Sequence, residues 1–153
     1  MSSSENTPDQ PHHAVQAWLN KRDPFSAWLG VIIEEIRPGY CRLRLPVRPE
    51  MLNGFGMLHG GVTFAAADTA FSIACNTHGR QSVGLTVTID YLEPGQPGDI
   101  ITIEAQEASL KHRVGVYEVG IRNQDGLRLA LFKGTAYRTS TENAAANSPK
   151  ATG

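Results

Sequence analysis

The sequence predicts an α+β domain in which a mostly antiparallel sheet of about six strands packs against one long helix. Only residues 60 to about 78 carry a long helical pattern of apolar residues. Most of the remaining chain alternates apolar and polar residues, most strictly from Val83 to Tyr91. Several strands with one dominant helix are typical of the α+β class.

The segment before the long helix predicts two short helical pieces and a hairpin. Residues 12–22 place Val15, Trp18 and Leu19 on one face of a short helix. Asp23-Pro24 ends this helix or opens a second short turn over residues 25–29. The next elements are two strands, a turn and a loop: residues 30–36 and 40–47 as strands, 37–39 as the turn between them, and 51–58 as a loop rich in Asn and Gly.

After the long helix the pattern predicts only strands. Gly79 stands where the C-cap of the helix is expected. The expected strands are residues 83–91, 99–110, 113–122 and 127–138, with turns at 94–98 and at the Asn123–Gly126 hairpin. One helix covers only part of one face of such a sheet, so we expect self-association.

Composition favours a single domain over residues 12–138, with disordered ends at residues 1–11 and 139–153. The chain has 153 residues, 41% of them hydrophobic, and a net charge of -1 without a basic block. These values argue against a nucleic-acid partner. No apolar run has the length of a membrane span, and the polar N-terminus lacks the features of a secretory signal. Cys41 and Cys75 form no CxxC motif. We therefore expect a reduced, cytoplasmic protein.

Asp68 lies in the middle of the apolar run VTFAAADTAF, where an ionised carboxylate needs a partner or a task. Gly60 and Gly61 begin the helix, whose free N–H groups can hold a developing negative oxygen. Asp68 follows two turns later on the same face. His59 precedes the helix, and Asn53 lies in the loop before it. This set indicates acyl transfer.

Each of these residues also has a simpler interpretation. Asp68 could cap a local group or pair with an arginine at an interface. His59 could be an ordinary hydrogen-bonded histidine, the glycine pair could provide loop flexibility, and Asn53 could be a turn residue. His12 and His13 have no metal-ligand spacing with other residues, so the sequence predicts no metal site.

The pattern N-G-x-x-x-x-H-G-G, followed after seven residues by Asp68, resembles the hot-dog-fold acyl-CoA thioesterases. The stretches MLNGFGMLHGG, ADTAFSIACNTHG, TIDYLEPGQPGD and ALFKG are similar to the PaaI-type thioesterases of bacterial phenylacetate degradation. The resemblance runs from about residue 14 to residue 138. It implies a hot-dog fold, in which an antiparallel sheet wraps around one long central helix.

The resemblance also implies roles for the site residues. Asp68 is the implied catalytic carboxylate, acting either as a general base on water or as a nucleophile. The N–H of Gly60 polarises the thioester carbonyl, and His59 and Asn53 position the carbonyl and the water. The implied site lies across a dimer interface, with Asp68 facing Asn53, His59 and Gly60 of the neighbouring subunit, and two dimers form a homotetramer. No cofactor and no metal are implied.

One position departs from the family pattern. Related thioesterases often place a Ser or Thr from the strand after the helix near the aspartate, whereas this chain has Gly84 there. Thr86, two residues on, has the same predicted face and is the expected replacement. Thr86, Gly61 and Phe64 are the expected substrate contacts. Burial beside Phe64 and Phe71 should raise the pKa of Asp68.

The leading hypothesis is hydrolysis of phenylacetyl-CoA, or its hydroxylated or ring-modified relatives, to the free acid and CoA. One alternative is a hot-dog hydratase or dehydratase acting on acyl thioesters, which typically relies on a histidine base and a differently placed acid. Another alternative is a module that binds acyl-CoA without catalysis. The combination of Asn53, His59, Gly60 and Asp68 favours the hydrolase.

Overall fold

The computed structural model describes residue 17 and residues 19–142. The predicted disordered segment 1–11, and residues 143–153 of the predicted tail, lie outside the described residues. Most of the predicted helix 12–22, including Val15 and Trp18, also lies outside. Its described part, residue 17 and residues 19–22, is helical, and Leu19 is buried.

Six strands form one sheet in the order β1-β2-β4-β5-β6-β3, and every neighbouring pair is antiparallel. The predicted hairpins and the single sheet are therefore confirmed. The strands are β1 (Ile32–Arg37), β2 (Tyr40–Pro46), β3 (Arg80–Tyr91), β4 (Ile100–Leu110), β5 (Val114–Arg122) and β6 (Arg128–Glu142).

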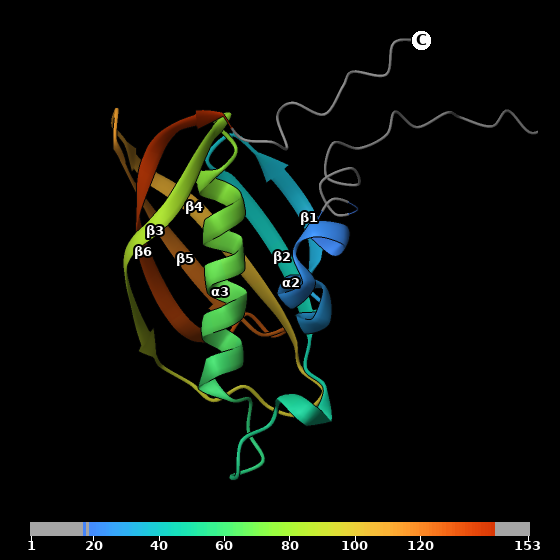
Figure 1. Cartoon of the computed structure of the whole chain (residues 1–153). Coiled ribbons are helices and arrows are strands. Elements are labelled where there is room, and N and C mark those ends of the chain that lie inside the picture. Colours follow the sequence, from blue (N-terminus) through green and yellow to red (C-terminus); the bar gives the residue numbers. More distant parts are fainter. Residues whose placement is uncertain (1–16, 18, 143–153) are drawn as a thin grey trace, which may run out of the picture.

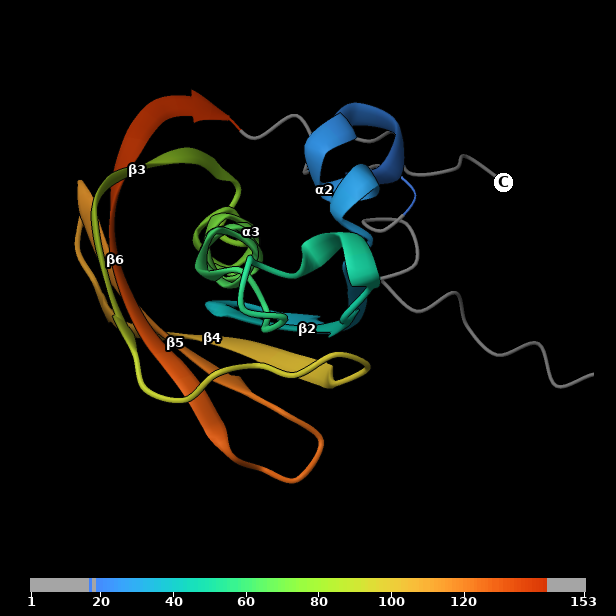
Figure 2. The same ribbon diagram turned by 90° about the horizontal axis from the view of Figure 1, so that it is seen from below.

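The sheet curves around the long helix α3 (Gly60–Cys75), which lies on its concave side (Figures 1 and 2). Alanines at positions 66, 67 and 70 of α3 are fully buried and allow the helix to approach the sheet closely. Phe71 fills the centre of the core, with its ring centroid 5.7 Å from that of Tyr117. The α+β prediction and the hot-dog arrangement are both confirmed.

The predicted second turn is the short helix α2 (Pro24–Leu29). The Asp23 side chain caps it by accepting from the Ser26 N–H (3.0 Å) and the Ser26 hydroxyl (2.7 Å). Gly30 ends it with a φ of 87°, a conformation that favours glycine. In Figure 2, α2 lies on the opposite side of α3 from β3.

Helix α3 ends at Cys75, three residues before the predicted end. The side chains that follow take over the last carbonyl groups: Asn76 Nδ2 donates to the Ser72 carbonyl and Thr77 Oγ1 to the Ala74 carbonyl, both at 2.8 Å. Asn76, rather than Gly79, is the C-cap, and Gly79 has a φ of 81° in the turn before β3.

Strand β6 continues to Glu142, four residues beyond the predicted end of the domain at residue 138. The extension pairs with the start of β3, where Arg80 lies opposite Glu142, and the Thr139 hydroxyl donates to the Gln81 carbonyl at 2.7 Å. Among the described residues, no helix is long and apolar enough to span a membrane. Both cysteines are buried and unpaired.

Candidate active site

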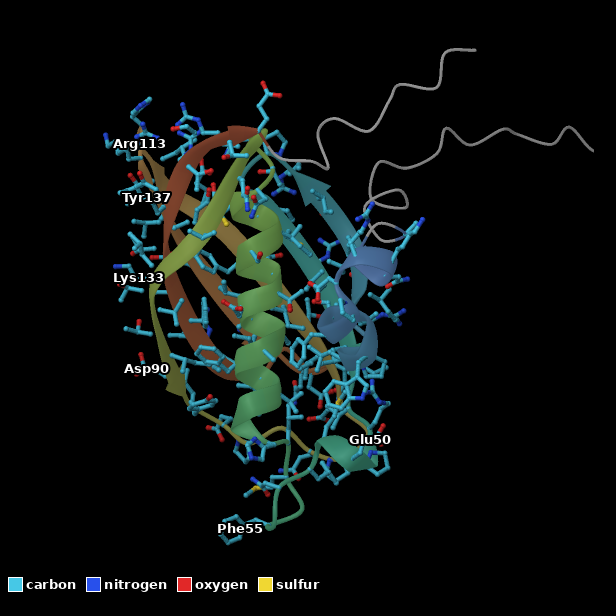
Figure 3. All side chains as sticks on the ribbon, viewed as in Figure 1. Glu50, Phe55, Asp90, Arg113, Lys133 and Tyr137 are labelled. Carbon is cyan, nitrogen blue, oxygen red and sulfur yellow. The ribbon has the colours of Figure 1, made fainter. Side chains whose placement is uncertain are left out.

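The loop before α3 is shaped by Asn53. Its Oδ1 accepts hydrogen bonds from the N–H groups of Phe55 (2.8 Å) and Met57 (3.2 Å), and its own N–H donates to the Met57 carbonyl (2.7 Å). The loop tip, Phe55, projects away from the domain (Figure 3). Asn53 thus stabilises the turn, because its Oδ1 accepts these two hydrogen bonds. Its Nδ2 group has no hydrogen-bond partner within residues 19–142 and is available to a ligand.

Two hydrogen bonds tie the end of this loop to its surroundings. The Leu58 N–H donates to the Gly95 carbonyl, and the His59 N–H donates to the Met51 carbonyl, both at 2.8 Å. The Leu58 and Met51 side chains are buried in the core. The loop therefore presents His59 to the first turn of α3 in a fixed position.

His59 caps α3 with its side chain, because its Nδ1 accepts a hydrogen bond from the Gly61 N–H at 2.8 Å. An accepting Nδ1 assigns the proton of the neutral ring to Nε2, which becomes a free donor. A Cβ atom on Gly61 would lie 2.9 Å from Nδ1. Gly61 is therefore a glycine because the imidazole ring occupies the space of a side chain.

Gly61→Ala should lower kcat/KM for a thioester substrate by about 10- to 100-fold, because the added methyl group displaces the His59 ring from the helix end. The measurement is steady-state hydrolysis together with the melting temperature. Gly120→Ala is the matched control, since no heavy atom lies within 4 Å of its added Cβ. Unchanged activity in Gly61→Ala would show that the position of the imidazole ring is unimportant.

Gly60 lies under a second ring. A Cβ atom on Gly60 would lie 3.2 Å from ring atoms of Tyr91, whose hydroxyl donates to the Gly60 carbonyl at 2.9 Å. Neither Gly60 nor Gly61 has a positive φ. The glycine pair therefore serves the close approach of two aromatic rings, not loop flexibility. The Gly60 N–H has no partner among the described residues and lies at the positive end of the helix.

Asp68 lies on the exposed side of α3, in line with Gly61 and Ser72. It forms no hydrogen bond or ion pair within the described chain, and partial desolvation raises the pKa of its carboxyl group above the ordinary aspartate value. The direction of the shift is as expected. The expected burial of Asp68 beside Phe71 is not found in a single chain. Phe71 points into the core, and Asp68 is exposed.

The raised pKa has a consequence for stability. A carboxyl group whose pKa is raised by folding destabilises the folded state at pH values above the pKa that the group has in the unfolded chain. This penalty disappears once the pH falls below that unfolded-state pKa. Asp68→Asn should therefore raise the melting temperature near pH 7 and lose this advantage near pH 3. Thermal melts of both proteins across this pH range test the expectation. A variant that melts below wild type at pH 7 would contradict it.

The described chain brings only part of the predicted site together. His59, Gly60 and Gly61 are neighbours at the start of α3, whereas Asn53 lies in the preceding loop opposite Met57. Asp68 lies eight residues beyond Gly60, about 12 Å along the helix axis. Donor and base must both lie about 3 Å from the reacting groups, so one chain does not place them on one thioester carbonyl.

Phe64 and Thr86, the other predicted substrate contacts, lie on different surfaces of the domain. Phe64 is partly buried and packs edge-on against Phe132, with ring centroids 5.6 Å apart, so it belongs to the core as well as to the rim of the site. The prediction that Thr86 faces the site is wrong. A bulge between Gly84 and Thr86 reverses the alternation, and Thr86 lies opposite Thr135 on the outer face of the sheet.

Gly84 does face α3, because a Cβ atom there would lie 3.4 Å from the Phe71 ring. It supplies no hydroxyl group. The nearest exposed hydroxyl along the helix is that of Ser72, one turn beyond Asp68. The residues from 19 to 142 contain no cluster of three His, Cys, Asp or Glu side chains able to hold a metal ion.

Comparisons with known proteins identify the family of this chain. The thioesterase superfamily model matches residues 55–130. The acyl-coenzyme A thioesterase PaaI of Escherichia coli is 38% identical over 128 residues, which cover 80% of this chain and 91% of the relative. The chain therefore belongs to the hot-dog-fold thioesterase superfamily and, within it, to the PaaI-type acyl-CoA thioesterases.

Solved structures show the same relationship. The structure of the E. coli PaaI protein, from the phenylacetic acid degradation operon, superposes with a TM-score of 0.81 at 36% identity and covers 88% of this chain and 99% of that one. A hypothetical thioesterase of Streptococcus pneumoniae, solved with coenzyme A, has a TM-score of 0.72 at 27% identity and covers 74% of this chain and 89% of that one.

Proposed function

We propose that this acyl-CoA thioesterase hydrolyses phenylacetyl-CoA, or its hydroxylated or ring-modified relatives, to the free acid and CoA in phenylacetate degradation. The similarity to the E. coli protein of the phenylacetic acid degradation operon supports this substrate class. The relative solved with coenzyme A supports a CoA thioester as the substrate. The reaction belongs in the cytoplasm, where CoA thioesters are made and used.

In the proposed reaction the thioester carbonyl oxygen accepts hydrogen bonds from the Gly60 N–H and from Nε2–H of His59. Asn53 Nδ2 holds the attacking water or the carbonyl. Asp68 acts either as a base that takes a proton from the water or as a nucleophile. The observation that supports this assignment is that the Gly60 N–H has no partner among residues 19–142 and lies beside His59, which caps the helix. The thiolate of CoA leaves as the tetrahedral intermediate collapses.

The site is proposed to be shared between two chains, because one chain separates Asp68 from Gly60 by about 12 Å. The free sheet edges indicate how the chains pair. Edge strand β1 has six residues, half of them charged. Edge strand β3 has twelve, and Val83 and Leu85 are exposed near its middle. A long apolar edge is the one that pairs with another chain.

Pairing of two β3 edges around a two-fold axis sets the two α3 helices antiparallel and side by side. This arrangement carries Asp68 of one chain toward the start of α3 in the other. The exposed aromatic pair of α2, Phe25 and Trp28, with ring centroids 5.9 Å apart, lies away from β3 and offers a surface on which two dimers form the proposed tetramer (Figure 2).

The test of the substrate class is release of free thiol from a panel of CoA thioesters: phenylacetyl, hydroxyphenylacetyl, benzoyl, acetyl, hexanoyl and palmitoyl. We expect kcat/KM for the arylacetyl thioesters to exceed that for hexanoyl-CoA by about tenfold or more. A preference for hexanoyl- or palmitoyl-CoA would overturn the substrate proposal. Binding of the thioesters without thiol release would favour the acyl-CoA-binding module, and addition of water to an enoyl-CoA would favour the hydratase.

A further inference from the structure

Tyr91, the last residue of β3, makes the one described side-chain hydrogen bond between the sheet and the first turn of α3. Its hydroxyl donates to the Gly60 carbonyl at 2.9 Å, and its ring covers Gly60 so closely that a Cβ atom there would lie 3.2 Å from two ring carbons. The backbone of Tyr91 is fixed in turn by its pairing with Ala130 of β6. The end of the sheet therefore holds the beginning of the helix.

We infer that Tyr91 is a positioning residue for the proposed oxyanion donor, the Gly60 N–H; this inference rests on the proposed function. The N–H belongs to the peptide group between His59 and Gly60, and the carbonyl that Tyr91 holds belongs to the next peptide group. Gly60 joins the two groups through its φ and ψ angles. Glycine has the widest freedom in these angles, so at the first residue of the helix an external contact narrows the range that they sample.

The His59 and Tyr91 rings contact different backbone groups at the start of α3. His59 satisfies the Gly61 N–H from the loop side, and Tyr91 holds the Gly60 carbonyl from the sheet side. The Gly60 N–H lies between these two contacts. It has no hydrogen-bond partner among the described residues, and its orientation is fixed. A preorganised donor stabilises an oxyanion because it does not reorient during the reaction. Loss of the tyrosine hydroxyl should therefore slow the chemical step more than it weakens substrate binding.

Tyr91→Phe tests this inference, because it keeps the ring and removes only the hydroxyl. With the best acyl-CoA of the panel, we expect kcat to fall about three- to tenfold and KM to change less than twofold. We also expect faster amide hydrogen exchange in the peptide covering residues 60–66. Light scattering must show the same oligomer as wild type, because Tyr91 lies on the edge strand that is proposed to pair.

The control is Tyr137→Phe. Tyr137 is an exposed tyrosine on β6 at the far end of the sheet from Phe55, and its hydroxyl makes no described hydrogen bond (Figure 3). This variant should match wild type in both measurements. If Tyr91→Phe exchanges faster but keeps its kcat, Tyr91 has only a structural role and the inference fails. If neither quantity changes, it fails as well. A wild-type protein that hydrolyses no thioester would overturn the proposed function and this inference together.

Discussion

Asp68→Asn should lower kcat for acyl-CoA hydrolysis by about 10²–10⁴-fold and leave the fold intact. The substitution keeps the shape of the side chain and removes the carboxylate that is proposed to activate water or attack the thioester. Because Asp68 has no partner in the described chain, no structural hydrogen bond or ion pair is lost. The loss should appear in kcat rather than in KM, since an exposed helix side chain adds little to substrate binding.

The control for this experiment is Asp125→Asn. Asp125 is an exposed aspartate of the β5–β6 hairpin turn. It should retain wild-type kcat under the same assay conditions. A drop of less than about tenfold in Asp68→Asn would mean that another group performs the proton transfer. Asp68 would then remain an unexplained carboxylate on an apolar helix.

Leu85→Lys at the β3 edge should separate the proposed dimer and abolish most of the activity. Leu85 is 60% exposed in the single chain, so a lysine there costs the isolated fold little. In a two-fold dimer it brings two positive charges to the same interface. We expect light scattering to report a particle smaller than the proposed tetramer, at most a pair of chains held through α2, and kcat/KM to fall by about 10²-fold or more because each chain then holds half a site.

The matched control is Leu131→Lys, which makes the same change on the outer face of β6, where Leu131 is 38% exposed. It should leave both the oligomer and the activity unchanged. A Leu85→Lys protein that remains a tetramer would place the interface elsewhere. A smaller particle with full activity would contradict the site shared across the β3 edge, because it would show that this pairing is not needed.

The fold was largely predictable from the sequence because its signals are local. The helical run after Gly60 and the alternation around Val87 define one helix and its strands without reference to the rest of the chain. The errors occurred where side chains overrule the pattern. Asn76 and Thr77 end α3 early by bonding its last carbonyl groups. At the same end of the sheet, pairing with the start of β3 extends β6 to Glu142.

The residues of the proposed site come from the sequence, but their arrangement in space does not. The spacing of His59, Gly60 and Asp68 indicated the chemistry, yet helix geometry separates the donor from the carboxylate in one chain. The bulge after Gly84 could not be foreseen from an alternating sequence, and it moved Thr86 to the outer face. In the sequence, Tyr91 appeared only as the last residue of a strand. Its contact with Gly60 joins residues 31 positions apart, and no local pattern indicates such a contact.

The most direct test of the shared thioesterase site combines two inactive variants, Asp68→Asn and His59→Ala, carrying different affinity tags. In a mixed dimer one site has both defects, and the other has the intact Asp68 of one chain and the intact His59 of its partner. We predict that mixed dimers selected through both tags regain up to about half of the wild-type rate of thiol release from acyl-CoA. Mixed dimers no more active than either variant alone would contradict the account.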